Sequence, residues 1–137
     1  MIHLLDTNTF SEAAKPEPNR HVLSRMVARQ FDWATSATAW EEFTLGVRAL
    51  AATARRKQLE AYRQSLLDAG LSILPFDERA AEWMADERAR LLKKGLTPSY
   101  RDAQIAAVAA TQDLTLVTRN TEDYRTFRNL RIENWFE

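Results

Sequence analysis

Four acidic residues lie where the sequence predicts the ends of strands or the first turns of helices. They are Asp6, Glu42, Asp102 and Asp123. Carboxylates that are brought together repel one another unless they are protonated or bound to a cation. A hard divalent ion takes oxygen ligands and stabilises charge on a phosphoryl oxygen. The four acids therefore indicate an all-oxygen Mg²⁺ or Mn²⁺ site, provided that the fold gathers them at one point.

The composition narrows the chemistry further. The 137 residues include no cysteine and only two histidines, His3 and His21, which excludes disulfides, thiolate nucleophiles and cysteine-type zinc sites. Lys+Arg and Asp+Glu both number 19, so a net-basic surface for nucleic acid is absent, although a local patch stays open. No apolar run approaches the ~20 residues that span a bilayer. We expect a cytoplasmic protein with one domain over residues 1–137 and no membrane contact.

Short apolar runs alternate with helical patterns along the chain. The strand-like runs are Ile2–Leu5, Trp33–Thr35, Ile73–Phe76, Leu114–Thr118 and, more weakly, Leu130–Ile132. The helical patterns are His21–Ala28, Ala39–Ala52, Arg55–Leu67, Arg79–Lys93 and Tyr100–Thr111, the second and third of which could be continuous. This alternation predicts an α/β fold with a parallel sheet. In such a sheet, residues after the carboxyl ends of strands gather in one crevice, where ligands bind.

Glu41 and Glu42 are neighbours, so only one of them is expected to face the crevice. The segment Thr38-Ala-Trp-Glu41 reads as a capping box, which gives Glu41 a structural role. Glu42 shares a helix face with Gly46, where the missing side chain would let another segment approach closely. We therefore assign Glu42 to the crevice.

Two other helix starts resemble looser capping boxes. They are Ser99 to Asp102 and Asn120 to Asp123, with aspartate at the last position of each. Asp102 and Asp123 could therefore serve only as helix caps. Gly95 is expected to end the preceding helix in a left-handed conformation.

Four segments, in this order, resemble the signature segments of PIN-domain nucleases: LLDTNTFS, WEEFTLGV, RDAQIAAVAA and LTLVTRNTEDY. The likeness runs over essentially the whole chain, and within the family it is to the VapC group of toxin–antitoxin ribonucleases, in its FitB-like, plasmid-stability branch. It implies a PIN-like three-layer α/β/α sandwich around a central, mostly parallel sheet of four to five strands.

The resemblance also implies roles for individual residues. It places the acids of the family on Asp6, Glu42, Asp102 and Asp123, as metal ligands and catalytic residues. The supporting polar residues that it implies are Thr7, Asn8, Thr118 and Asn120. It further implies an endoribonuclease that depends on Mg²⁺ or Mn²⁺ and leaves a 5′-phosphate and a 3′-hydroxyl. The implied partners are RNA, a second copy of the chain, and a cognate antitoxin whose C-terminal segment covers the active site and alone contacts DNA.

Basic residues near the acids are candidates for contact with phosphate. Arg119 and Arg125 flank Asp123, and Arg101 precedes Asp102. Arg101 could instead simply pair with an acid. A further set of charged residues reads as a solvated helix face with local pairs: Glu82, Asp86, Glu87, Arg88 and Arg90.

Three other functions compete with the nuclease as readings of the sequence. A haloacid-dehalogenase-type phosphatase needs a second acid two residues after the first, but that position is Asn8. A receiver-like signalling domain fits poorly with Glu42 on a helix and with Arg119 where a lysine is expected. A catalytically idle PIN fold kept for binding stays open, although the retention of all four acids argues against it.

Overall fold

The computed structural model describes residues 1–30 and 32–137. Its centre is a five-stranded sheet in the order β3-β2-β1-β4-β5, and every neighbouring pair of strands is parallel. The strands are β1 (His3–Leu5), β2 (Trp33–Ser36), β3 (Ser72–Leu74), β4 (Thr115–Val117) and β5 (Ile132–Glu133). The predicted α/β class and parallel sheet are confirmed.

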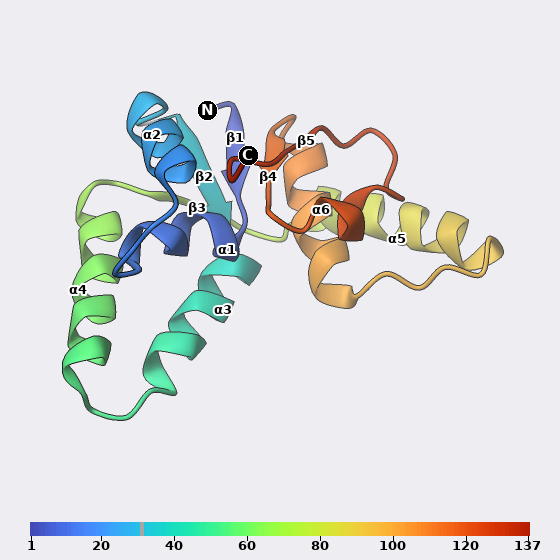
Figure 1. The fold of residues 1–137 in the computed structure, drawn as a ribbon. Helices are drawn as coiled ribbons and strands as arrows, with labels where there is room; N and C mark the ends of the chain where they lie inside the picture. The colour runs from blue at the N-terminus through green and yellow to red at the C-terminus, as the bar shows by residue number, and fades with distance from the viewer. Residues whose placement is uncertain (31) are drawn as a thin grey trace.

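Helices flank the sheet on both sides (Figure 1). One side carries α1 (Thr7–Phe10), the 3-10 helix η1 (Ser11–Ala14), α2 (Arg20–Ala28), α3 (Ala37–Arg48) and α4 (Ala54–Asp68). The other side carries α5 (Glu78–Lys93) and α6 (Tyr100–Thr111), and the 3-10 helix η2 (Thr121–Tyr124) follows β4. Within the described residues, no helix combines the length and apolarity that crossing a membrane would require.

The strand order creates a switch point beside β1. The chain first builds β2 and β3 on one side of β1, and then crosses over to build β4 and β5 on the other side. The carboxyl ends of β1 and β4 are therefore neighbours, and the backbone N–H of Asp6 donates to Val117 O at 2.9 Å. A ligand crevice is expected at such a switch point.

A continuous apolar core holds that edge of the sheet in place. Both central strands are buried on both faces, as parallel strands covered by helices usually are. Helix α6 contacts both α5 and β4, and half of its residues are buried, including Ala103, Ala106, Ala107 and Ala109. Small side chains let neighbouring elements pack close to this helix. Each fully buried Leu or Val of the core contributes about 1.5–3 kcal/mol.

The start of α3 differs from the prediction. Ser36 is the cap of this helix, and its hydroxyl accepts the backbone N–H of Ala39 at 3.1 Å. The hydroxyl of Thr38 is instead 3.2 Å from the side-chain oxygen of Gln104. The predicted capping box of Thr38 and Glu41 is wrong, because Ser36 at the end of β2 has the extended backbone that a cap needs and comes first in the chain.

At the other helix ends, some predicted caps are present and others are not. Ser99 caps α6 by accepting the backbone N–H of Asp102 at 3.0 Å, and Gly95 follows α5 with φ +74°, as predicted. The side chain of Asn120 makes no cap hydrogen bond to η2, so that prediction is wrong. Helices α3 and α4 are separate, since Thr53 caps α4 with its hydroxyl.

Glu87 does not lie on a solvated face of α5. Its side chain is only 6% exposed, and its two oxygens accept a fork of hydrogen bonds from Arg90, both at 2.9 Å. The backbone N–H of Arg128 also donates to Oε1 at 2.6 Å. The hydrogen bonds from Arg90 are the main reason that the pKa of Glu87 lies below its ordinary value, despite burial. The local pair of Glu87 with Arg90 is as predicted. Helix periodicity misses the contact of Glu87 with Arg128, because Arg128 comes from the distant segment after η2.

Replacing Glu87 with Gln is expected to lower the free energy of unfolding by about 1–3 kcal/mol at pH 7, since buried donors lose a charged acceptor. A lowered folded-state pKa stabilises the protein above the ordinary glutamate pKa, and this stabilisation is lost as the pH falls through the folded-state value. The difference in the free energy of unfolding between wild type and Glu87→Gln should therefore narrow toward about pH 3. Urea unfolding at pH 7 and at about pH 3 measures this difference. Glu82→Gln, on the exposed face of α5, is the matched control; a gap that widens in acid would contradict the assignment.

Candidate active site

Asp6 both ends β1 and begins α1. Its backbone is extended (φ −70°, ψ 160°), and its Oδ1 accepts the N–H of Thr7 at 2.8 Å, so it is the cap of α1. The hydroxyl of Thr7 donates to Ala39 O at 3.2 Å, which joins α1 to α3. The side chain of Asp6 is fully buried. A short helix immediately after the strand was not predicted, although an aspartate before small polar residues is a common helix start.

Polar side chains from the end of β4 hold the second oxygen of Asp6. The hydroxyl of Thr118 donates to Oδ2 at 2.9 Å. Thr118 in turn accepts the side-chain amide of Asn8 at 3.4 Å and the backbone N–H of Asn120 at 3.1 Å. The polar residues that follow the two central strands therefore form one network, and it fixes the orientation of the Asp6 carboxylate.

Arg101 joins three of the four predicted acids. Its Nη2 is 2.7 Å from Asp6 Oδ1 and 2.8 Å from Glu42 Oε1, and its Nη1 is 2.8 Å from Asp102 Oδ1. Its Nε also donates to Glu42 Oε2, which completes a two-pronged pair with that carboxylate. Partial burial lowers the pKa of Arg101, but the hydrogen bonds and charges of Glu42 and Asp6 raise it further, so the guanidinium stays charged. Of the two predicted roles of Arg101, pairing with acids is the one that the structure shows.

Glu42 and Glu41 face different surroundings, as predicted. Glu42 reaches Arg101 from α3, whereas Glu41 is exposed. Burial raises the pKa of Glu42, but the hydrogen bond from Arg101 contributes to a net lowering. The reason offered from Gly46 is wrong, because a Cβ built there would meet nothing within 4 Å.

Asp123 stands apart from the other three acids. It lies in η2 and is exposed, and among the described residues no hydrogen bond or ion pair joins its carboxylate to Asp6, Glu42 or Asp102. Its backbone N–H donates to Asn120 O at 3.1 Å. Three acids therefore converge, and the roles of all four in catalysis remain predictions.

Tyr124 is a member of the site that the sequence did not reveal. It is fully buried, and its hydroxyl is 3.1 Å from Asp102 Oδ1, 3.4 Å from Asp6 Oδ2 and 3.3 Å from Arg101 Nη1. Burial, and then the nearby carboxylates, raise the pKa of Tyr124, so the hydroxyl keeps its proton. The available signal was a single aromatic residue within the polar segment TRNTEDYR, since a buried tyrosine needs a partner for its hydroxyl.

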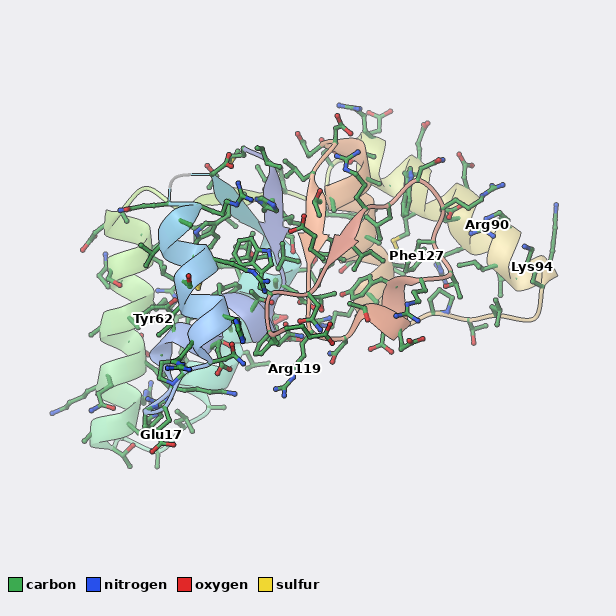
Figure 2. The ribbon with its side chains drawn as sticks, turned by 45° about the horizontal axis from the view of Figure 1, so that its top comes forward. Glu17, Tyr62, Arg90, Lys94, Arg119 and Phe127 are labelled. Atoms are coloured by element: carbon green, nitrogen blue, oxygen red, sulfur yellow. The ribbon has the colours of Figure 1, made fainter. Side chains whose placement is uncertain are left out.

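The other predicted basic residues lie on the surface. The backbone N–H of Arg119 donates to Asn8 Oδ1 at 3.2 Å, and its guanidinium lies 4.7 Å from the centre of the Phe136 ring. Figure 2 shows Arg119 projecting from the segment after β4. Arg125 is mostly exposed and pairs with Glu122. Contact of these residues with phosphate stays a prediction.

The chemistry of the converging side chains fits a hard divalent ion. Asp6, Glu42 and Asp102 offer only oxygen donors, which Mg²⁺ and Mn²⁺ prefer. Yet within residues 1–30 and 32–137, no group of three acidic or histidine side chains is arranged to hold a metal ion as it stands. The guanidinium of Arg101 lies between the carboxylates that would have to close around such an ion.

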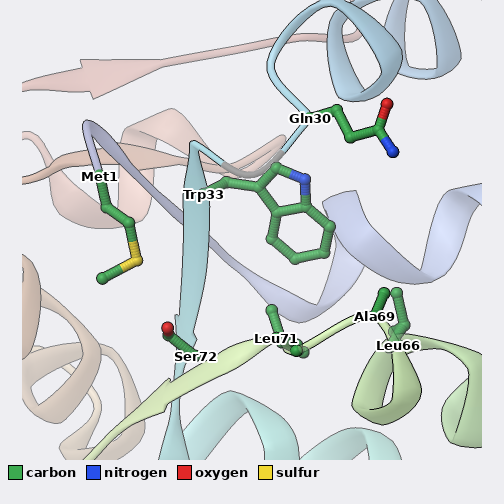
Figure 3. A pocket seen from close by; sticks show the side chains of 8 residues that line it. Met1, Gln30, Trp33, Leu66, Ala69, Leu71 and Ser72 are labelled. Atoms are coloured by element: carbon green, nitrogen blue, oxygen red, sulfur yellow. The ribbon is translucent and has the colours of Figure 1, made fainter.

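An apolar cavity lies at the opposite end of the sheet (Figure 3). Its volume is about 340 Å³, and the ring of Trp33, at the start of β2, borders it. Ser72 at the start of β3 and Met1 before β1 also line it. No carboxylate is among its described lining residues, and it faces the amino ends of the strands, so it is separate from the acidic site.

Similarity to known proteins shows the family to which the chain belongs. A family model described as the PIN domain matches residues 3–130. The chain belongs to the PIN-domain family.

This PIN domain is 37% identical over 126 residues to the toxin FitB of Neisseria gonorrhoeae, covering 88% of this chain and 89% of the relative. It is 27% identical over 136 residues to ribonuclease VapC2 of Rickettsia felis, covering 98% of both. The crystal structure of FitAcB from Neisseria gonorrhoeae superposes with a TM-score of 0.89, at 32% identity over 99% of both chains. The predicted family and fold are confirmed.

Removing the hydroxyl of Tyr124 tests its part in the network. Tyr124→Phe is expected to keep the fold and to lower the free energy of unfolding by about 1–2 kcal/mol, because charged acceptors lose a donor. Urea unfolding in EDTA at pH 7 measures the change. Tyr100→Phe is the matched control, since the side chain of Tyr100 is exposed. Equal stabilities of the two variants would show that the hydroxyl of Tyr124 contributes nothing to the network.

Proposed function

We propose that this PIN domain is a metal-dependent endoribonuclease and the toxin of a type II toxin–antitoxin pair, with residues 1–137 forming a single domain. The observation that carries the proposal is the convergence of Asp6, Glu42 and Asp102, from three different elements, on one point at the carboxyl edge of the sheet. The relatives named as a toxin and as a ribonuclease support the same function.

In this proposal the converging carboxylates hold Mg²⁺ or Mn²⁺. When bound, such an ion supplies an activated water and stabilises negative charge on the phosphoryl oxygens. Thr118 and Tyr124 hold the buried Asp6 carboxylate in a fixed orientation before RNA arrives. Asp123 is proposed as a fourth acid that acts from the rim. Water attacks the phosphorus as the bond from phosphorus to the 3′ oxygen breaks, and one proton of that water ends on the departing oxygen. The products are a 5′-phosphate and a 3′-hydroxyl.

The surface residues and the relatives suggest the partners. Arg119 and Arg125 are proposed to contact RNA phosphates beside the acids. Solved neighbours of the fold include a member of the VapBC family of toxin–antitoxin systems from Mycobacterium tuberculosis. We propose a cognate antitoxin whose C-terminal segment covers the site, a homodimer, DNA contact only through the antitoxin, and a cytoplasmic location.

Two observations favour a second candidate, a catalytically idle PIN fold that acts by binding. Arg101 neutralises part of the acidic site, and Asp123 stands apart from it. An idle module would bind its partner without cutting RNA in any divalent metal.

RNA cleavage by variants of Asp6, Glu42 and the neighbouring Glu41 tests the nuclease activity directly. Glu42→Gln and Asp6→Asn are expected to lower the cleavage rate by about 100-fold or more, because a charged metal ligand is lost. Glu41→Gln should cut at the wild-type rate, since its side chain faces solvent. The measurement is cleavage of total RNA with Mg²⁺, with Mn²⁺ and with EDTA, alongside circular dichroism to confirm folding. Equal rates for the Glu41 and Glu42 variants would break the assignment, and an inactive wild type would favour the binding module.

Growth of a bacterial host tests the toxin role. Induced expression of the wild type without an antitoxin is expected to arrest growth, because uncontrolled cleavage removes essential RNA. Asp6→Asn should relieve the arrest at equal protein levels, measured by immunoblot. Normal growth with wild-type protein that cuts RNA in vitro would separate nuclease activity from toxicity and count against the toxin role.

A further inference from the structure

The guanidinium of Arg101 is fully engaged within the acidic site. A guanidinium has five N–H donors. Nε donates to Glu42, Nη2 faces Asp6 and Glu42, and Nη1 faces Asp102 and Tyr124. The five donors are therefore matched by five acceptor atoms, four of which belong to carboxylates. Arg101 therefore neutralises part of the negative charge of the site, and none of its donors is left free for substrate.

The oxygens of Asp6 show which of its partners can leave. Oδ1 accepts the backbone N–H of Thr7 and the guanidinium of Arg101, and Oδ2 faces the hydroxyls of Thr118 and Tyr124. Thr118 and Tyr124 are fully buried, and the Thr7 donor is fixed by α1. The side chain of Arg101 is 31% exposed, and its guanidinium lies at the end of a long, flexible stem. A metal ion that uses Asp6 as a ligand can displace Arg101 with far less rearrangement than any other donor.

Charge points to the same exchange. Three carboxylates and one guanidinium leave the cluster with a net charge of −2, which attracts a divalent cation. A metal ion among the same oxygens would lie within contact distance of the guanidinium and repel it. The two cations therefore compete for one set of oxygens.

We propose that Arg101 is a resident counter-ion of the acidic site, and that a divalent metal ion binds by displacing it. Arg101 thereby sets the metal concentration at which the site fills. The inference rests on the proposed function, because it takes Asp6, Glu42 and Asp102 as the metal ligands. Without metal, Arg101 also relieves the repulsion among the three acids and stabilises the fold.

Calorimetric titration of the full chain with MnCl₂ tests the competition. Arg101→Gln is expected to bind Mn²⁺ at least about tenfold more tightly than the wild type, because no ion pairs must first be broken. Arg88→Gln is the matched control, since it removes one positive charge from an exposed residue outside the cluster. In EDTA, Arg101→Gln should have a lower melting temperature than the wild type. Saturating Mn²⁺ should raise the melting temperature of Arg101→Gln by more than it raises that of the wild type.

A second measurement needs no variant of Arg101 to fold. In ¹⁵N-labelled wild type, the Nε–H signal of Arg101 should shift and lose its protection from solvent exchange as MgCl₂ is added. An Arg101 signal that stays unchanged while Mg²⁺ saturates the site would overturn the displacement.

The titrations separate failure of the inference from failure of the proposed function. Equal Mn²⁺ affinities in wild type and Arg101→Gln overturn the competition but leave the metal site standing. Weaker binding by Arg101→Gln also overturns it, and makes Arg101 a positioning residue that holds the acids for the metal. If neither protein binds Mn²⁺ at millimolar concentration, and Asp6→Asn behaves like the wild type, the proposed metal-dependent function itself fails.

Discussion

Burial of the Asp6 carboxylate is the constraint around which the rest of the structure is arranged. An ionised carboxylate removed from water without partners costs many kcal/mol, so it persists only where donors surround it. Here the donors come from the backbone of α1, from Thr118 at the end of β4, from Tyr124 in η2 and from Arg101 in α6. Each of these elements must lie where it does for the charge to be tolerated.

The topology of the sheet is what makes that convergence possible. Placing β1 between β2 and β4 puts the first strand at the switch point, where two chain segments more than 100 residues apart meet. Helix α6 then delivers Asp102 and Arg101 to the same edge, and its buried alanine-rich body limits how far its first turn can move. The site is thus built at the edge of a buried core, whereas the exposed acid Asp123 lies on a short 3-10 helix.

Periodicity and local capping rules predicted those features that depend on neighbouring residues. The five strands and the helix α6 with its Ser99 cap follow from patterns a few residues long. Glu42, not Glu41, faces Arg101 as predicted, although neither local reason given for that choice holds in the structure. What the sequence could not show depends on partners far along the chain. Glu87 is buried by the segment around Arg128, and Tyr124 acquires its partners only when η2 folds over α6. The cap of α3 was misplaced for a different reason, since Ser36 belongs to the strand and the helix at once.

Asp6 has two separate duties, as a helix cap and as a buried charge. Asparagine caps a helix about as well as aspartate does, whereas alanine does not. In a lineage released from selection for nuclease activity, position 6 can therefore change to asparagine with the start of α1 intact. The net charge of the three carboxylates and Arg101 would change from −2 to −1, while the cap of α1 stayed in place. Loss of the charge and loss of the fold are thus uncoupled at this position.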